Sequence, residues 1–185
     1  MTEQRTIAVV DYDPSWSFAF ENLKSRVMQV LGGIAVSIEH VGSTSVPGLA
    51  AKPIIDMDVV VASAADADGA IRRLATIGYA HRGDLGIAGR EAFHPPPGLP
   101  AHHLYVCVQD AVALANHLAV RDFLRRNAAA ARAYGLLKTR LADLFPNDID
   151  RYVSGKTDFL VGILRDSRFT DDVLAAIDDA NRAGP

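Results

Sequence analysis

Residues 39–61 read EHVGSTSVPGLAAKPIIDMDVVV, and this stretch decides the fold of the chain. A run of strand-forming residues ends at Val41, a turn of small residues follows it, and a second apolar run begins at Ile54. Inside the second run, Asp56 and Asp58 occupy alternate positions. Because side chains alternate between the two faces of a strand, we expect both carboxylates on the same side of a sheet. The stretch therefore predicts the order strand, turn, short helix and acidic strand.

The turn between the two strands has the composition of an anion site. Gly42 permits a sharp bend of the backbone. Ser43, Thr44 and Ser45 offer hydroxyls beside the amide groups of an expected helix start. We therefore expect phosphate groups to bind at this turn.

The acidic strand is a candidate metal site. Two carboxylates that point the same way repel each other, and a hard divalent cation relieves that repulsion. Magnesium typically takes one or two protein carboxylates together with phosphate oxygens of a substrate, so Asp56 and Asp58 are candidate ligands for Mg²⁺ or Mn²⁺. The alternative, two solvated aspartates on an edge strand, is disfavoured because the flanking Ile, Met and Val residues indicate a central strand, where an unpaired charge is costly.

These motifs carry a resemblance to known families. A Gly-Ser turn twelve residues before an Asp-x-Asp strand resembles the nucleotidyltransferase superfamily to which DNA polymerase beta belongs. The longer string GSTSVPGLAAKPIID resembles the GrpB family more narrowly. Further matches are HHLYV, NHLAVRDFLR, AYGLLK and YVSGKTDF, so the resemblance covers most of the chain, residues 7–164.

The resemblance and the hydrophobic periodicity together predict an α/β (α+β) fold, with a small mixed sheet, flanking helices and a C-terminal helical group. The length of 185 residues favours one domain over residues 1–185, with a sheet-containing core at 1–110 and a helical part at 111–185. The expected strands are 6–10, 34–41, 54–61, 79–82, 87–94 and 101–108. The expected helices are 16–31, 64–77, 111–126, 128–144, 157–167 and 171–182.

Two adjacent histidines mark a departure from the superfamily pattern. Polymerase-beta-like enzymes commonly take a third carboxylate from a later strand, and the corresponding strand here, 101–108, carries His102 and His103. Because successive strand residues face opposite sides, only one of them can face the acidic pair. We expect His103 there, since its neighbours on the same face are the more polar set. The alternatives for a third acid, Glu91 and Asp110, are expected to be surface charges.

Candidate cations for the phosphates are Lys52, Arg90 and Lys156, the last within a Tyr-x-x-Gly-Lys pattern near an expected helix start. Arg121 is expected to pair with Asp122 and so to fix its helix against the sheet.

Composition excludes several classes of function. The net charge of -3 without a Lys/Arg cluster disfavours binding of a nucleic acid polymer. The single Cys107 forms no internal disulfide, and the chain has no signal-like start and no long apolar run, so we expect a cytoplasmic protein that does not bind membranes.

The hypothesis that these features favour is metal-dependent transfer of a nucleotidyl group from a nucleoside triphosphate to a small acceptor. One alternative is a non-catalytic nucleotide- or phosphate-binding accessory domain; GrpB-like domains occur fused to dephospho-CoA kinase, which implies a link to coenzyme A metabolism. Another is a histidine-assisted metal hydrolase that uses His102 or His103. Preference for magnesium with a triphosphate, or for zinc or manganese without one, separates these hypotheses.

Overall fold

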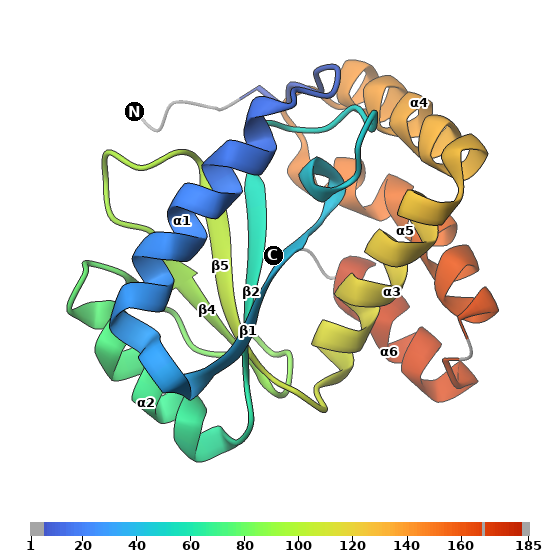
Figure 1. The fold of residues 1–185 in the computed structure, drawn as a ribbon. Coiled ribbons are helices and arrows are strands. Elements are labelled where there is room, and N and C mark those ends of the chain that lie inside the picture. Colours follow the sequence, from blue (N-terminus) through green and yellow to red (C-terminus); the bar gives the residue numbers. More distant parts are fainter. Residues whose placement is uncertain (1–5, 168, 183–185) are drawn as a thin grey trace.

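The computed structural model describes residues 6–167 and 169–182. Within them the strands are β1 (Ala35–Val41), β2 (Ile55–Val61), β3 (Ala80–His81), β4 (Arg90–His94) and β5 (His102–Val108). The helices are α1 (Ser15–Leu31), α2 (Ala64–Ala75), α3 (Val112–Arg126), α4 (Ala128–Leu144), α5 (Ile149–Asp166) and α6 (Asp171–Arg182), with single 3₁₀ turns at Gly32–Ile34 and Ser43–Ser45. The predicted α/β fold with a mixed sheet and a C-terminal helical group is confirmed (Figure 1).

The acidic strand β2 lies inside a mixed sheet of order β1-β2-β5-β4-β3. It pairs antiparallel with β1 and parallel with β5, and β4 is antiparallel to β5. The register places Asp56 beside His103 and Asp58 beside Tyr105. A central strand with hydrogen bonds on both sides fixes the direction of these side chains.

One face of the sheet holds the main hydrophobic core. Alternate residues of β2, from Ile55 to Val61, pack with Leu104 and Val106 of β5 against the apolar stripes of α1 and α2. Leu23, Val27, Leu31 and Leu74 are among the residues that those helices bury there. Because the period of a strand is two, the residues in between, including both aspartates, face the opposite side.

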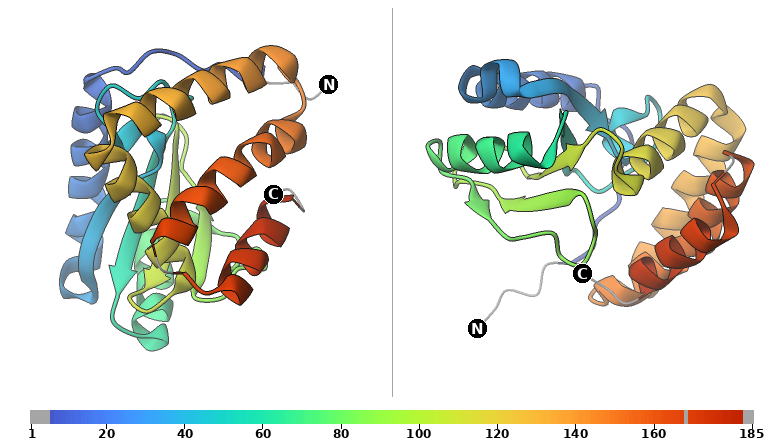
Figure 2. Two further views of the ribbon diagram at one scale, coloured as in Figure 1. Left: turned by 90° about the vertical axis from the view of Figure 1, so that its right-hand side faces the viewer. Right: turned by 90° about the horizontal axis from the view of Figure 1, so that it is seen from below.

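The opposite face of the sheet meets α3, and the remaining C-terminal helices form a layer beyond it (Figure 2). A second cluster joins this layer to the turn after β1, where Val46 and Leu49 pack against Leu124, Tyr134 and Ile163. The helices are amphipathic, and in the described ranges none combines the length and apolarity that crossing a bilayer requires.

Two expected elements differ at the N-terminal side of the fold. Residues 6–10 do not form a strand, because only Val10 pairs with Ala51, through reciprocal 2.9 Å hydrogen bonds. The expected short helix after Gly42 is a single 3₁₀ turn, Ser43–Ser45.

Helix α5 is the largest correction. It begins at Ile149 rather than at residue 157, because the side chain of Asp148 caps it by accepting a 3.0 Å hydrogen bond from the backbone N–H of Arg151. Lys156 therefore lies in the middle of the helix and not near its start. The neighbouring Pro146 was correctly expected to end α4.

The glycines of α5 test the packing of the helical layer. A Cβ at Gly155 would lie 2.5 Å from Leu141 Cδ2 in buried α4 packing, whereas Gly162 has open space around it. We expect Gly162→Ala to raise the free energy of unfolding by about 0.5–1 kcal/mol through helix propensity. Gly155→Ala should lower it by about 1–2 kcal/mol, because overpacking outweighs the same gain. Urea unfolding measures both, and equal shifts would contradict this packing.

Candidate functional site

The turn and the acidic strand meet at Gly42 and Asp56. Gly42 has φ +68° and ψ -174°, a region that only glycine readily adopts. A Cβ at this position would lie 2.8 Å from Asp56 Cγ, so the absence of a side chain lets the backbone press against the carboxylate. The next residue, Ser43, lines the same cavity as Asp56. The predicted proximity of the turn and the acidic strand is therefore present in the fold.

Two of the three hydroxyls expected to hold an anion instead form hydrogen bonds within the protein that stabilise the turn. Buried Thr44 donates from Oγ1 to the carbonyl of Ile54 at 3.2 Å, and the same oxygen lies 3.1 Å from His40 Nε2. Buried Ser45 donates to the carbonyl of Gly42 at 2.6 Å. The hydroxyl of Ser43 is thus the one of the three that this internal network does not use.

His103 lies beside Asp56, with Nδ1 2.8 Å from Asp56 Oδ1, and half of its side chain is exposed. His102 points to the opposite face, where its Nε2 lies 2.7 Å from the hydroxyl of Tyr79 and its Nδ1 lies 2.7 Å from the carbonyl oxygen of Pro100. Burial lowers the pKa of His102. The geometry agrees with the expected assignment of the two histidines, and a catalytic role for His103 stays a prediction.

Asp58 is fully buried, and its partner is His117 of α3, whose Nδ1 lies 2.7 Å from Asp58 Oδ2. Burial opposes a charge on His117, but the attraction of the carboxylate outweighs it and raises the pKa of the imidazole. Asp58 Oδ1 is buried without a hydrogen-bond partner among the described residues. Sequence reasoning missed this pair, because nothing local links two residues that lie on different elements.

One helical turn beyond His117, Arg121 anchors α3 to the sheet. It donates to Glu39 at 2.8 Å and to Asp122 at 2.7 Å. The expected Arg121–Asp122 pair is confirmed, and the contact with Glu39 of β1 is the one that joins helix to strand.

Three lysines gather on the other side of Asp56. The ammonium groups of Lys52 and Lys156 lie 5.4 and 4.6 Å from the ring centre of Tyr152. Lys138, which the sequence analysis missed, is buried and donates to the carbonyl of Ala50 at 2.5 Å. Burial, reinforced by Lys156, lowers the pKa of Lys138 to about 7, and burial, reinforced by Lys52, lowers that of Lys156 to about 8.

Arg90 does not join this group. Its guanidinium stacks on the ring of Tyr105 at 4.5 Å, and it lines a different cavity from Ser43 and Asp56. Because β4 lies one strand beyond β5, Arg90 lines a separate cavity, and the expectation that Arg90 and the lysines surround the same phosphates stays a prediction.

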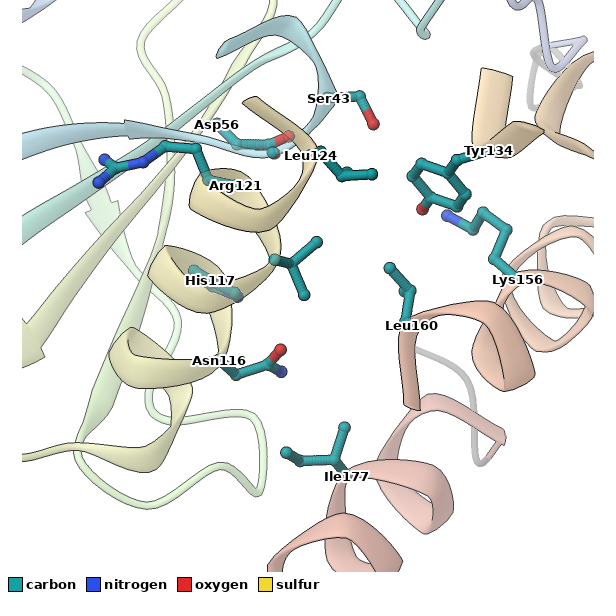
Figure 3. A pocket seen from close by; sticks show the side chains of 12 residues that line it. Ser43, Asp56, Asn116, His117, Arg121, Leu124, Tyr134, Lys156, Leu160 and Ile177 are labelled. Atoms are coloured by element: carbon teal, nitrogen blue, oxygen red, sulfur yellow. The ribbon is translucent and has the colours of Figure 1, made fainter. Parts of the chain in front are cut away.

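Two cavities meet at Ser43, Asp56 and Lys156. The first, of about 230 Å³, lies between α3 and helices α4–α6 (Figure 3). Its other lining residues are Gly42, Asn116, His117, Val120, Arg121, Leu124, Tyr134, Leu160 and Ile177. The second, of about 80 Å³, adds Thr44, Ala51, Lys52, Ile54, His103, Lys138 and Tyr152. The site thus offers a carboxylate, cations and an apolar wall around one opening, which suits a polyphosphate that carries an organic group.

The acidic strand supplies two carboxylates to a candidate cation site. Across residues 6–167 and 169–182, no three His, Cys, Asp or Glu side chains form a group that could hold a metal ion. Asp58 Oδ1 has no hydrogen-bond partner among the described residues, and Asp56 lines both cavities, which Asp58 does not. Carboxylate oxygens are the ligand type of magnesium, which keeps several waters and takes its other ligands from substrate phosphates.

The contact between Gly42 and Asp56 is tested by comparing two glycines with positive φ. Gly48 has φ +78° but open space around it, so Gly48→Ala carries backbone strain alone and should lower the free energy of unfolding by about 1 kcal/mol. Gly42→Ala adds the collision with Asp56 and should lower it by roughly 3 kcal/mol. Urea unfolding gives both values. Equal losses of unfolding free energy would show that the close approach of Gly42 to Asp56 adds no cost for a side chain at position 42.

The Asp58–His117 pair predicts a pH dependence of stability. Since the folded pKa of His117 lies above its ordinary value of 6.5, the stabilisation is fully present below pH 6.5 and is lost as the pH rises through the folded pKa. In Asp58→Asn, burial and the charge of Arg90 both lower the pKa of His117 and only the charge of Asp56 still raises it, so this loss with rising pH should disappear. Urea unfolding between pH 5.5 and 9 is the measurement, with exposed His94→Gln as the control that should follow wild type. Parallel profiles for wild type and Asp58→Asn would refute the pair.

Comparison with known proteins gives relatives over most of the chain. The family model described as "GrpB protein" matches residues 6–166. The UPF0157 protein YqkA of Bacillus subtilis (strain 168) is 35% identical over 157 residues, which are 85% of this chain but only 46% of the Bacillus protein. The glutamate-rich protein GrpB of Alkalihalophilus pseudofirmus is 32% identical over 165 residues, 86% of this chain and 95% of the relative. A dephospho-CoA kinase of Mycolicibacterium paratuberculosis is 36% identical over 76 residues, 40% of this chain and 19% of the kinase.

Solved structures agree with this assignment. The crystal structure of the conserved protein GrpB from Enterococcus faecalis has a TM-score of 0.77 at 36% identity and covers 91% of this chain and 98% of its own. A structure of the Cid1 poly(U) polymerase with MgGTP bound has a TM-score of 0.51 at 15% identity, over 72% of this chain and 44% of Cid1, a likeness of fold alone. The chain belongs to the GrpB family and has a nucleotidyltransferase-like fold.

Proposed function

We propose that this protein binds a nucleoside triphosphate at the Gly42–Ser43 turn and transfers its nucleotidyl group to a small acceptor. The observation that carries the proposal is that Ser43, Asp56 and Lys156, from three separate elements, line one cavity. The Cid1 structure of similar fold is described as binding MgGTP, which supports a nucleotide in this kind of scaffold. The net charge of -3 favours a small acceptor over a nucleic acid polymer, and a cytoplasmic location is part of the same proposal.

The lysines are suited to the outer phosphates. Lys52, Lys138 and Lys156 all have pKa values lowered by burial, which disfavours their charges. A triphosphate supplies negative charge that stabilises the protonated form of these lysines. The hydroxyl of Ser43 is available to donate a hydrogen bond to a phosphate oxygen. Each lysine that takes up a proton then strengthens the binding of the nucleotide through a charge-assisted hydrogen bond to a phosphate.

The apolar wall is suited to the organic part of the nucleotide. Tyr134 and Leu160 line the first cavity from α4 and α5, and Figure 3 shows them facing the side chains of α3 across it. The ring of Tyr134 already stacks on Phe159 with a centroid distance of 5.0 Å, and Lys138 Nζ lies over it at 4.7 Å, so Tyr134 offers a base apolar contact and not a free ring face for stacking. The amide of Asn116 on the opposite wall, from α3, can donate and accept hydrogen bonds and so distinguish base edges.

The two aspartates are suited to hold a divalent cation, Mg²⁺ or Mn²⁺, beside the phosphates. When bound, such a cation neutralises charge on the phosphoryl oxygens and lowers the pKa of the acceptor. Asp56 and Asp58 keep their orientation through His103 and His117 respectively. His103 is half exposed and in contact with Asp56, so it can accept a proton from an acceptor hydroxyl. Catalysis then depends on positioning and on the electrostatics of these groups.

A second candidate function is a nucleotide-binding accessory domain without turnover. It is favoured by the engagement of both carboxylates with imidazoles, which leaves fewer oxygens for a cation. The similarity of part of the chain to a dephospho-CoA kinase supports a link of such a domain to coenzyme A metabolism. A histidine-assisted metal hydrolase is the third candidate, supported by the contact of His103 with Asp56 alone.

The test compares thermal stabilisation and pyrophosphate release with each nucleoside triphosphate, with and without Mg²⁺ or Mn²⁺. A nucleotide at 100 times its Kd should add roughly 2.7 kcal/mol to the stability of wild type. Asp56→Asn should abolish the metal-dependent part of the stabilisation and reduce pyrophosphate release at least 100-fold, because a cation ligand is removed. The control is Asp68→Asn, the same change at an exposed position of α2, which should behave as wild type.

The outcomes separate the candidates. Stabilisation by nucleotide without pyrophosphate release from any triphosphate would support the accessory domain and reject transfer. Stabilisation by zinc or manganese without nucleotide, lost in His103→Ala, would support the hydrolase. No response to any nucleotide or metal would reject all three.

A further inference from the structure

A third cavity, of about 320 Å³, lies beside the candidate nucleotide cavity and plays no part in the function proposed above. The loop before β4, the strand β4 itself, α3 and α6 all contribute to it. Its apolar lining residues are Ile87, Ala88, Val112, Ala113, Val173, Ala176 and Ile177. Arg90, Asn116 and His117 add polar groups, and Gly86 completes the wall. An apolar cavity with a few polar groups is typical of a small-molecule site.

Arg90 is the polar group that gives this cavity its chemistry. Its guanidinium carbon lies over the ring of Tyr105, 4.5 Å from the ring centre, and this cation–π contact restricts its position. Its Nε is buried and has no hydrogen-bond partner in the described part of the chain. Because buried N–H groups in folded proteins are almost always paired, the protein alone leaves this guanidinium incompletely satisfied, and the rest of the group lines the cavity.

The preferred ligand of such a group is a carboxylate. A guanidinium presents parallel N–H donors that match the two oxygens of a carboxylate. Nearby Asp58 limits the negative charge that the cavity tolerates, so a singly charged anion is favoured over a phosphate. The apolar remainder of the wall requires an apolar body on the same molecule.

The position of the cavity connects it with the candidate nucleotide site. Asn116, His117 and Ile177 line both cavities, so ligands in the two would be neighbours. We propose that the Arg90 cavity binds a small monocarboxylate with an apolar body, and that this molecule is the acceptor. The proposed binding of a carboxylate does not depend on the proposed function, whereas the acceptor role rests on it.

The transfer step balances with the two substrates alone. A carboxylate oxygen forms a bond to the α-phosphorus of the nucleoside triphosphate. The bond from that phosphorus to the α,β-bridging oxygen breaks, and its electron pair leaves with pyrophosphate. The product is an acyl nucleotide with a mixed anhydride, and no proton, oxidant or reductant is required.

The binding experiment uses hexanoate and its neutral isostere hexanamide, titrated into the wild-type chain without nucleotide or metal. Wild type should bind hexanoate at least tenfold more tightly than hexanamide, because only the acid forms a charge-assisted pair with Arg90. In Arg90→Gln the two probes should bind equally weakly. Arg72→Gln, the same change on exposed α2, should leave hexanoate binding unchanged.

A second variant tests the cavity without touching its charge. Ala176→Phe on α6 fills the space from an exposed position and should weaken hexanoate binding at least tenfold while the melting temperature stays near that of wild type. Equal affinity of wild type for the acid and the amide, or unchanged hexanoate affinity in Arg90→Gln and Ala176→Phe, would overturn the site.

Pyrophosphate release distinguishes the acceptor role from the site. With a nucleoside triphosphate and Mg²⁺, hexanoate should accelerate release and hexanamide should not. Acceleration by both probes would overturn the acceptor role. Binding of hexanoate together with no release under any condition would overturn the proposed transfer and leave the carboxylate site standing.

Discussion

The buried carboxylate of Asp58 is the constraint on which the arrangement of this protein depends. It is fully buried in the middle of a central strand, where an ionised carboxylate without a partner is strongly destabilising. The partner comes from α3, so His117 ties the first C-terminal helix to the sheet. Arg121 repeats that connection one turn later through Glu39. Helices α4 and α5 pack against α3. The position of α3 on the sheet therefore determines the cleft between the sheet and the other C-terminal helices.

The same cleft collects charges that burial disfavours. Lys138 and Lys156 have pKa values lowered towards neutrality, and Lys52 is shifted in the same direction. A fold selected for stability alone would replace such side chains with apolar ones of similar size, because buried charges seldom stabilise by themselves. Perturbed groups that converge on one cavity are more typical of a site that is completed by an anionic ligand.

Local pattern was sufficient for most of the fold. Residues 55–59 alternate between apolar and acidic side chains inside an apolar run, so both the strand and the common face of the two aspartates could be predicted, and α6 was predicted with the bounds that the structure has. The start of α5 was missed because a capping side chain at Asp148, rather than hydrophobic periodicity, sets it. Site residues could be predicted to be neighbours only when they lie on the same strand or in the same turn.

What sequence reasoning missed are contacts between distant elements. Asp58 and His117 are 59 positions apart, and Lys138 and Ala50 are 88 apart. Each of these residues alone looks ordinary: a histidine and a lysine on amphipathic helices. Their roles depend on how α3 packs on the sheet and how α4 packs on the segment after β1, which no local spacing encodes. That Arg90 lines a separate cavity has the same origin, since its place depends on the order of strands and not on its own neighbours in the sequence.

The histidines also shape the electrostatics of the acidic strand. His103 meets Asp56 from β5, and His117 meets Asp58 from α3. A carboxylate in either place would add negative charge beside the aspartates, whereas an imidazole adds none. Under the proposed function, the protein alone therefore binds a cation weakly, and the phosphates of the nucleotide supply further oxygens. The proposed function thus has nucleotide and cation binding together, with the two histidines setting that dependence.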